Sequence, residues 1–261
     1  MSVNTSLIHP RLFTTLILYD PIIQSSVPQG IFLANITNNR KDHWPSRAEA
    51  ETYFRDLKPH SSWDERVLNL WLEYGLREIP ISRHHASSEA ATTRLKSITL
   101  TTPKNLESRS YIRHISPSTP DLDPSTSHTT HPFYRPEPAI TLANLPHLRP
   151  SLLYVFPEKS AMATLELQEE KMERTGVGVG GSGGEKAGAV VREVLKGAGH
   201  LCVFEGVGEC AEVSVRWLEA QLRVLEERDE EENGEKAVGE DDWKEKVQEW
   251  MKSRGKAKPR L

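Results

Sequence analysis

The stretch Gly197-Ala198-Gly199-His200-Leu201 places a histidine on a glycine-rich turn, directly after the apolar run Ala189-Val190-Val191-Arg192-Glu193-Val194-Leu195. The run is short and rich in β-branched residues, so it predicts a buried strand. Helical periodicity follows over residues 207–225. This order of strand, turn and helix presents His200 at the carboxyl end of an α/β sheet, where it can act as a general base near neutral pH. The alternative interpretation is a loop histidine without a chemical role.

Two further apolar runs predict strands of the same kind. Phe13-Thr14-Thr15-Leu16-Ile17-Leu18-Tyr19 is ended by Asp20-Pro21, and Ser151-Leu152-Leu153-Tyr154-Val155-Phe156 is followed by Pro157-Glu158-Lys159-Ser160. Residues 1–8 predict the last turns of a helix that stops before a proline. A chain that begins inside a helix leading into a buried strand is unusual, so we expect a sequence that is truncated at its front.

The segment between the first two strands contains signals for helices. Ser46-Arg47-Ala48-Glu49 and Ser62-Trp63-Asp64-Glu65 are capping boxes, each followed by apolar residues at helical spacing, and the second helix is predicted to end at Gly75. A short strand at residues 98–101 and a helix at residues 105–112 are predicted next. Beyond them, the Pro-, Ser-, Thr- and His-rich residues 116–138 predict a surface loop.

Residues 176–188 are glycine-rich, and Gly176-x-Gly178-x-x-Gly181 matches a dinucleotide-binding fingerprint as a string. A charged helix, predicted over residues 162–174, precedes it where the fingerprint requires a strand, and no helix is predicted to begin from it. We therefore expect a flexible linker and no cofactor. The serine of Gly181-Ser182-Gly183 lies in the same linker, without a strand before it.

The composition argues against several classes of protein. In 261 residues, a hydrophobic content of 37% and a mean hydropathy of −0.53 indicate sizeable disordered segments. The net charge of −4, and a basic segment at residues 252–260 without aromatic residues, argue against a nucleic-acid partner. No apolar run approaches the roughly 20 residues of a membrane span.

The cysteines and the chain ends bear on the compartment. Cys202 and Cys210 are too few for a disulfide scaffold and lack a second Cys/His pair for a zinc site, so we expect a reduced, intracellular protein. The apolar residues 12–23 contain an Asp-Pro and follow no basic segment, which argues against a signal peptide. Pro259-Arg260-Leu261 is a loose match to the Ser-Lys-Leu peroxisomal signal, so we expect a cytoplasmic protein, with the peroxisome as the alternative.

The histidines and aromatic residues between the first two strands have a structural interpretation. His84-His85, His128 and His131 lie in polar segments without carboxylates at ligand spacing, so we expect solvated side chains and no metal site. The aromatic residues, many at helical spacing, predict an ordinary core, and the alternative is a pocket for a small apolar substrate. They are Trp44, Tyr53, Phe54, Trp63, Trp71 and Tyr74.

Four short motifs occur in the chain: His9-Pro10-Arg11-Leu12-Phe13, Trp44-Pro45-Ser46-Arg47, His131-Pro132-Phe133-Tyr134-Arg135-Pro136-Glu137 and Glu170-Lys171-Met172-Glu173-Arg174-Thr175-Gly176. Together they resemble, in their order, the fungal toxin-biosynthesis and peroxisomal lipase-like hydrolases of the α/β-hydrolase superfamily. The resemblance, over about residues 3–225, implies a partial α/β-hydrolase fold with the sixth, seventh and eighth parallel strands of the sheet.

The same resemblance implies a division of the chain into segments. Residues 1–23 would begin the remaining hydrolase core, and residues 24–149 would form a helical cap insertion over the active site. Residues 150–228 would complete the core. Residues 229–261 would be a charged, disordered tail, because an acidic stretch and a basic stretch follow each other there.

In such a hydrolase, His200 stands at the position of the triad histidine, which deprotonates the nucleophile. The acid that orients it normally follows the seventh strand, and Ser160 stands at that position here. Some members of the superfamily place the acid after the sixth strand, which makes Asp20 the first candidate and Glu158 the second. A structural alternative for Asp20 is a turn residue, because Asp-Pro commonly ends strands.

The nucleophile elbow of the superfamily, Gly-x-Ser-x-Gly, is expected about a dozen residues before His9-Pro10, ahead of Met1, and we expect no such motif within the chain. We therefore expect a hydrolase of esters, lipids or epoxides that is inactive as written, with a small apolar ester-like substrate for the whole enzyme. The alternative is a non-catalytic fragment or binding module. Residues 12–19 would then be an exposed edge strand, which predicts self-association.

Overall fold

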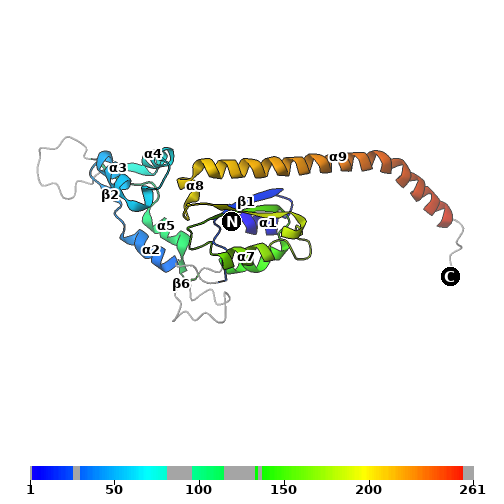
Figure 1. The fold of residues 1–261 in the computed structure, drawn as a ribbon, viewed down its shortest axis with the longest axis horizontal. Helices are drawn as coiled ribbons and strands as arrows, with labels where there is room; N and C mark the ends of the chain where they lie inside the picture. Colours follow the sequence, from blue (N-terminus) through cyan, green and yellow to red (C-terminus); the bar gives the residue numbers. More distant parts are fainter. Residues whose placement is uncertain (1, 26–29, 81–95, 115–132, 135–136, 255–261) are drawn as a thin grey trace, which may run out of the picture. The chain divides into compact units, whose positions relative to one another are not determined.

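The computed structural model describes residues 2–25, 30–80, 96–114, 133–134 and 137–254, and it divides into two compact units, Met1–Cys210 and Ala211–Leu261 (Figure 1). The second unit contains most of one long helix. The elements, in chain order, are α1 (Ser2–Ile8), β1 (Thr15–Tyr19), α2 (Gly30–Asn39), β2 (His43–Trp44), α3 (Arg47–Asp56), η1 (Lys58–His60), α4 (Glu65–Tyr74), β3 (Leu76–Pro80), β4 (Lys96–Leu100), α5 (Lys104–Tyr111), β5 (Arg113–His114), β6 (Phe133–Tyr134), α6 (Glu137–Asn144), η3 (Leu145–His147), β7 (Ser151–Pro157), α7 (Leu165–Arg174), η4 (Glu185–Ala187), β8 (Val190–Leu195), α8 (Cys202–Glu205) and α9 (Val207–Arg254).

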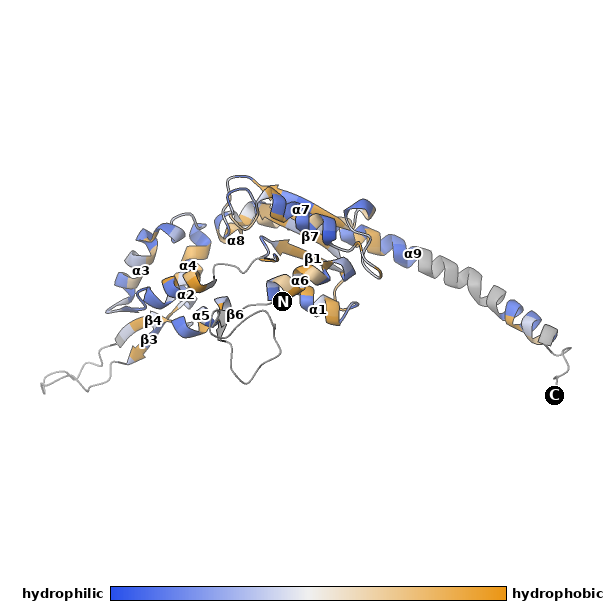
Figure 2. Cartoon of the chain, turned by 90° about the horizontal axis from the view of Figure 1, so that it is seen from below, coloured by the Kyte–Doolittle hydropathy of each residue, from blue (hydrophilic) through white to orange (hydrophobic). Residues whose placement is uncertain are grey.

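The main sheet of the first unit has three parallel strands in the order β1-β7-β8. Leu16 pairs in register with Leu152, and Leu153 pairs with Val191. Every residue of β7 after Ser151 is buried, as expected for the central strand of a parallel sheet. The strands are among the more hydrophobic segments of the chain (Figure 2). The prediction of an α/β fold with these three parallel strands is confirmed.

One face of the sheet packs against α1, α6 and α7. Leu152, Tyr154 and Phe156 alternate along β7 and share a buried cluster with residues from these helices, which include Val3, Leu142 and Met172. This is the period-two pattern by which a strand presents one face to a core. The helices therefore hold β7 in place, and with it the turns that follow the three strands.

The chain between β1 and β7 folds around a second buried cluster. Trp44, Phe54, Leu68 and Ile98 are buried in it, and the rings of Trp44 and Phe54 lie 5.2 Å apart. The helices are accompanied by a small antiparallel sheet of order β2-β4-β3 and by the pair β5-β6. The expectation of a helical insertion is therefore too simple, because only the strand at residues 98–101 was predicted there.

The two helices with capping signals form, but only one begins at its predicted residue. Ser46 caps α3 by accepting a hydrogen bond from the backbone N–H of Glu49 at 3.2 Å. For α4 the N-cap is Asp64, two residues after Ser62, and its carboxylate accepts from the N–H of Arg66 at 2.9 Å. An aspartate is as good an N-cap as a serine, so the capping-box pattern alone did not distinguish the two starts.

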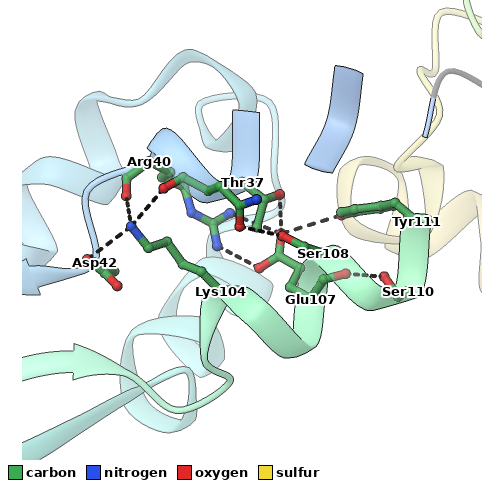
Figure 3. Close-up of polar contacts among 9 residues, drawn as sticks. Thr37, Arg40, Asp42, Lys104, Glu107, Ser108, Ser110 and Tyr111 are labelled. Carbon is green, nitrogen blue, oxygen red and sulfur yellow. Dashed lines mark hydrogen bonds and ion pairs between the residues drawn. The ribbon is translucent and has the colours of Figure 1, made fainter. Parts of the chain in front are cut away.

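A polar network joins α2 to α5 (Figure 3). Arg40 Nη2 and Nη1 donate to the two carboxylate oxygens of Glu107 at 2.6 and 3.3 Å, and the hydroxyl of Thr37 donates to the same carboxylate at 3.1 Å. Lys104 Nζ lies 3.3 Å from Asp42 Oδ1 and donates to the backbone carbonyl of Arg40 at 2.9 Å. The bidentate Arg–Glu pair fixes the orientation of the two helices, because both hydrogen bonds require a common plane.

The glycine-rich segment is a hydrogen-bonded loop and not the expected flexible linker. The N–H groups of Gly176, Gly178 and Ser182 donate to the carbonyls of Leu145, Pro146 and Leu148, all at 2.8–2.9 Å. Gly176 has φ +73°, in the left-handed region that favours glycine. The glycines therefore serve close backbone packing against η3.

The part of the expected disordered tail that the structure describes, residues 229–254, is helical, because α9 continues without a break from Val207 to Arg254. Residues 207–254 contain no proline and are rich in Glu, Lys and Arg, which are strong helix formers. Within this tail the sequence indicated a helix only at residues 241–251, and the structure extends it in both directions. Pro259-Arg260-Leu261, the loop at residues 116–132 and the histidines at positions 84, 85, 128 and 131 lie outside the described residues. In the part of the chain that the structure describes, no helix is long and apolar enough to cross a bilayer.

Candidate active site

Three turns at the carboxyl ends of the parallel strands bring Asp20, Ser160 and His200 together. Asp20 follows β1, Ser160 follows β7 and His200 follows β8. His200 Nδ1 lies 2.6 Å from Asp20 Oδ2, and Ser160 Oγ donates a hydrogen bond to the same oxygen. Residues up to 180 positions apart in sequence therefore meet, as neighbouring parallel strands require.

Asp20 is held in an unusual backbone conformation. Its φ is +39°, and among the described residues it is the one non-glycine residue with a positive φ. Its N–H continues the ladder by donating to Val155 O at 2.9 Å, and its side chain is 1% exposed. Aspartate tolerates this region better than most residues, and such strain is commonly found at functional sites.

The contact with Asp20 determines the state of His200. Because an ionised carboxylate only accepts hydrogen bonds, Nδ1 of His200 must be the donor, which leaves Nε2 to exchange a proton. The hydrogen bond to Asp20 raises the pKa of His200 above its usual value, against the opposing effect of burial. Its side chain is 47% exposed, so the ring is accessible to a reacting group.

Glu158, the second candidate for the acid, has a different partner. Its Oε2 accepts a hydrogen bond from the backbone N–H of Gly197 at 2.7 Å. Glu205, which the sequence did not single out, accepts in the same way from Gly199 N–H at 2.7 Å. The two carboxylates thus hold the turn that leads to His200, and Glu205 also favours the protonated form of His200 electrostatically.

A buried lysine lies in this region, on α7. The side chain of Lys171 is fully buried, and its Nζ donates to Leu167 O at 3.0 Å and lies 6.0 Å from the centre of the Phe156 ring. Burial lowers the pKa of Lys171, while the negative charges of Asp20 and Glu170 act against this effect. Of the apolar residues on this helix, Met172 is buried and Leu165 is 60% exposed, so the spacing of apolar residues does not reveal the buried lysine.

Two residues of the chain, Cys202 and Ser182, are nucleophiles by type but lack the surroundings that a catalytic nucleophile needs. Burial raises the pKa of Cys202 to about 12, so its thiol stays protonated. Ser182 lies in Gly180-Gly181-Ser182-Gly183-Gly184, which matches Gly-x-Ser-x-Gly as a string, so the expectation that the chain lacks this motif is wrong. Its N–H donates to Leu148 O, just before β7 begins, so it lies at the amino end of the strand, opposite to His200. Neither the strand before it nor the helix after it, which an elbow requires, is present.

Five of the six aromatic residues that predicted a core in the insertion contact each other, whereas Tyr74 is 66% exposed. Trp63 and Trp71 lie 5.9 Å apart, and Trp63 also contacts Phe204 of α8, with ring centres 4.8 Å apart. The N–H of Asp64 donates to the carbonyl of Phe204 at 2.7 Å. The start of α4 is thereby joined to the short helix that follows the His200 turn. Within the described residues, no group of three or more His, Cys, Asp and Glu side chains is arranged to hold a metal ion.

Comparison with known proteins finds similarity to fungal thioesterases and to an abhydrolase domain-containing protein, although no family model matches the chain. It is 34% identical over 246 residues to type I acyl-CoA thioesterase mpaH of Penicillium roqueforti and 35% identical over 249 residues to mpaH of Penicillium brevicompactum. Each match covers 84% of this chain and 56% of the relative, so the chain spans little more than half the length of these relatives. The abhydrolase domain-containing protein AKT2 of Alternaria alternata is 24% identical over 213 residues, covering 80% of this chain and 75% of that protein.

Solved structures agree on the fold. The peroxisomal α/β-hydrolase Lpx1 from Saccharomyces cerevisiae superposes with a TM-score of 0.57 at 12% identity, over 85% of this chain and 50% of that one. E-2-(acetamidomethylene)succinate hydrolase superposes with a TM-score of 0.54 at 9% identity, over 84% and 62% of the two chains. At these identities the likeness is one of fold alone.

Proposed function

Because the chain belongs to the α/β-hydrolase superfamily, we propose that it supplies the acid–base half of a thioester- or ester-cleaving catalytic triad, with His200 as the base and Asp20 as its acid. The observation that carries this proposal is the 2.6 Å contact between His200 Nδ1 and Asp20 Oδ2 at the carboxyl edge of the sheet. In the proposed reaction, His200 Nε2 removes the proton of a nucleophile and later returns it to the leaving group. Asp20 holds the ring in the required tautomer and stabilises the imidazolium.

We assign the nucleophile to a polypeptide segment outside these 261 residues. Ser182 lies in the one Gly-x-Ser-x-Gly string of the sequence, and its position at the amino end of β7 does not suit attack assisted by His200. The two thioesterase relatives are longer than the matched region, so their remaining parts are the first place to look for the missing serine and the oxyanion donors. On its own, residues 1–261 should then be inactive.

The proposed substrate is a thioester or ester with an apolar acyl group. The relatives that are 34% and 35% identical to this chain over the matched region are named acyl-CoA thioesterases, which favours a thioester. A protein inside the cell suits both this substrate class and the free cysteines Cys202 and Cys210. The proposed compartment is the cytoplasm or the peroxisome, and a fluorescent fusion with Pro259-Arg260-Leu261 left free at the end distinguishes them.

The test joins this chain to the part of the Penicillium brevicompactum thioesterase that lies outside the matched region. We expect the fusion to hydrolyse acyl-CoA and to react covalently with a fluorophosphonate probe, whereas residues 1–261 alone do neither. His200→Ala or Asp20→Asn in the fusion should lower kcat/KM by about 10³–10⁴-fold.

Ser182→Ala is the matched control for this experiment, since Ser182 lies at the far end of the strand, and its activity should equal that of the parent fusion. Activity that survives His200→Ala would contradict the proposed role of the histidine. A parent fusion that folds but is inactive would favour the alternative of a non-catalytic binding module. Labelling of residues 1–261 alone would show a nucleophile within this chain.

A further inference from the structure

Ser160 and His200 meet at the same oxygen of Asp20, and we propose that Ser160 is a positioning residue that fixes the Asp20 carboxylate toward the histidine. The inference rests on the proposed function in one respect, which is that the Asp20–His200 pair takes part in catalysis. It concerns the geometry of that pair, which can be measured without any substrate.

The turn after β7 holds Ser160 in one orientation. Its N–H donates to Pro157 O at 3.2 Å, and its carbonyl accepts from Ala163 N–H at 3.1 Å. Its Oγ accepts from the N–H of Met162 at 3.1 Å. A hydroxyl has a single proton, and with Oγ accepting from Met162 and facing a carboxylate that can only accept, this proton points at Asp20. The residue is 8% exposed, so little water competes for it.

The Asp20 carboxylate needs such a partner because its other oxygen has none. Among the described residues, no hydrogen-bond donor reaches Asp20 Oδ1, which is buried. The terminal torsion of an aspartate has a broad energy profile, so contacts and not rotamer preference determine where its oxygens point. The side chain of His200 is 47% exposed, whereas Ser160 is 8% exposed, which leaves Ser160 as the buried donor that orients Oδ2.

The Oδ2 atom of Asp20 can hold both partners at once. A carboxylate oxygen has two lone-pair sites, so the hydroxyl of Ser160 and the N–H of His200 can occupy Oδ2 together. Ser160 therefore supports the Asp20–His200 contact without displacing it.

The test is proton and nitrogen NMR of residues 1–261 with labelled histidine, following the Nδ1–H resonance of His200 and its pH titration. In Ser160→Ala we expect Nδ1–H to exchange with water about tenfold faster, as for the loss of one hydrogen bond to a charged group. The pKa of His200 should fall toward its usual value, since the contact with Asp20 is its main cause of elevation. Ser160→Thr keeps the hydroxyl and should restore both properties.

Ser61→Ala is the matched control, because Ser61 is an exposed serine whose hydroxyl donates to Lys58 O at 2.8 Å, in the insertion. An unchanged or higher pKa of His200 in a folded Ser160→Ala protein would overturn the proposal, because it would mean that Ser160 competes with His200 for Oδ2. Ser160→Cys, a near-isosteric weak donor, replaces Ser160→Ala if that variant does not fold, with the same direction expected.

A second variant separates this inference from the proposed function. Asp20→Asn alone should abolish the slowly exchanging Nδ1–H, and asparagine tolerates the positive φ of this position. Adding Ser160→Asp should restore the slowly exchanging Nδ1–H, because a carboxylate at position 160 would lie near Nδ1 of His200. No recovery in the folded double variant would show that position 160 does not face His200. Inactivity of the fusion protein would leave both NMR results standing.

Discussion

At the scale of single residues, the Asp20–His200 contact links stability to pH. The hydrogen bond to Asp20, and the nearby charge of Glu205, raise the pKa of His200 in the folded protein above its usual 6.5. The protonated form is therefore favoured by folding. The resulting stability is fully present below pH 6.5 and is lost as the pH rises through the folded-state pKa.

The prediction compares the chain with His200→Asn in urea between pH 6 and pH 8.5. The difference in free energy of unfolding between the two proteins should be largest at the acidic end and should shrink as the pH rises. In an Asp20→Asn background the same comparison should give a difference that hardly varies with pH. A difference that grows with pH would mean that His200 is not held as the imidazolium by Asp20.

At the scale of elements, the glycine-rich loop depends on close backbone contacts with the segment before β7. A Cβ at Gly181 would lie 2.4 Å from Gly176 O and 2.5 Å from Pro146 O, both backbone atoms that cannot turn away. We expect Gly181→Ala to lower the free energy of unfolding by about 1–3 kcal/mol. Gly208→Ala in α9, where a Cβ meets nothing within 4 Å, is the control and should be neutral or slightly stabilising. Equal effects of the two substitutions would contradict a packed loop.

The network between α2 and α5 makes a second prediction at this scale (Figure 3). The Arg40 and Glu107 side chains are 20% and 22% exposed, so removing one leaves the other partly desolvated without its partner. Glu107→Ala should cost about 1–3 kcal/mol, and a double-mutant cycle with Arg40→Ala should show coupling. Glu51→Ala, which breaks an exposed pair with Arg55, should cost less than about 1 kcal/mol. If the double-mutant cycle shows no coupling between Arg40 and Glu107, their ion pair does not contribute to stability.

At the scale of the whole molecule, β1 is an edge strand of the sheet formed by the described residues. Apolar side chains next to it are exposed, with Leu12 at 56% and Ile8 at 71%. Because exposed strand edges recruit other chains, we expect residues 1–261 to self-associate unless a further segment covers β1. Sedimentation velocity should show an apparent mass that rises with protein concentration. Amide hydrogen exchange in β1 should become slower as the protein concentration rises.

Leu12→Lys is the control for this prediction, since a lysine beside a strand edge disfavours pairing with another chain. It should shift the sedimentation toward the monomer while the rest of the sheet keeps its protection. A concentration-independent monomer with strongly protected β1 amides in the unmodified chain would show that the edge is already covered.

The sequence alone determined the local structure wherever one physical signal dominates. The β-branched and apolar runs predicted the positions of β1, β7 and β8. Only β7 is buried along its length, whereas the predicted burial of β8 is wrong, because this strand lies at the edge of the sheet formed by the described residues and is buried only at Val190 and Leu195. The cap at Ser46 predicted the start of α3, because its hydroxyl satisfies a backbone N–H that the helix leaves open. His200 could be singled out from its turn, and Asp20 could be named as the first candidate acid only through a family resemblance.

The tertiary structure decided everything that depends on partners distant in sequence. Local patterns could not show that Ser160 and His200 share one oxygen of Asp20. The three residues meet because the strand order β1-β7-β8 brings the turns after these strands together. Lys171 has the sequence signature of a solvated helix residue, yet the fold buries it beside the sheet. The glycine-rich loop has the composition of a linker, and only the carbonyls of η3 and the residue after it give its N–H groups their partners. Burial and pairing are properties of the folded chain. A local sequence pattern predicts them only where a single local structure can accommodate the pattern.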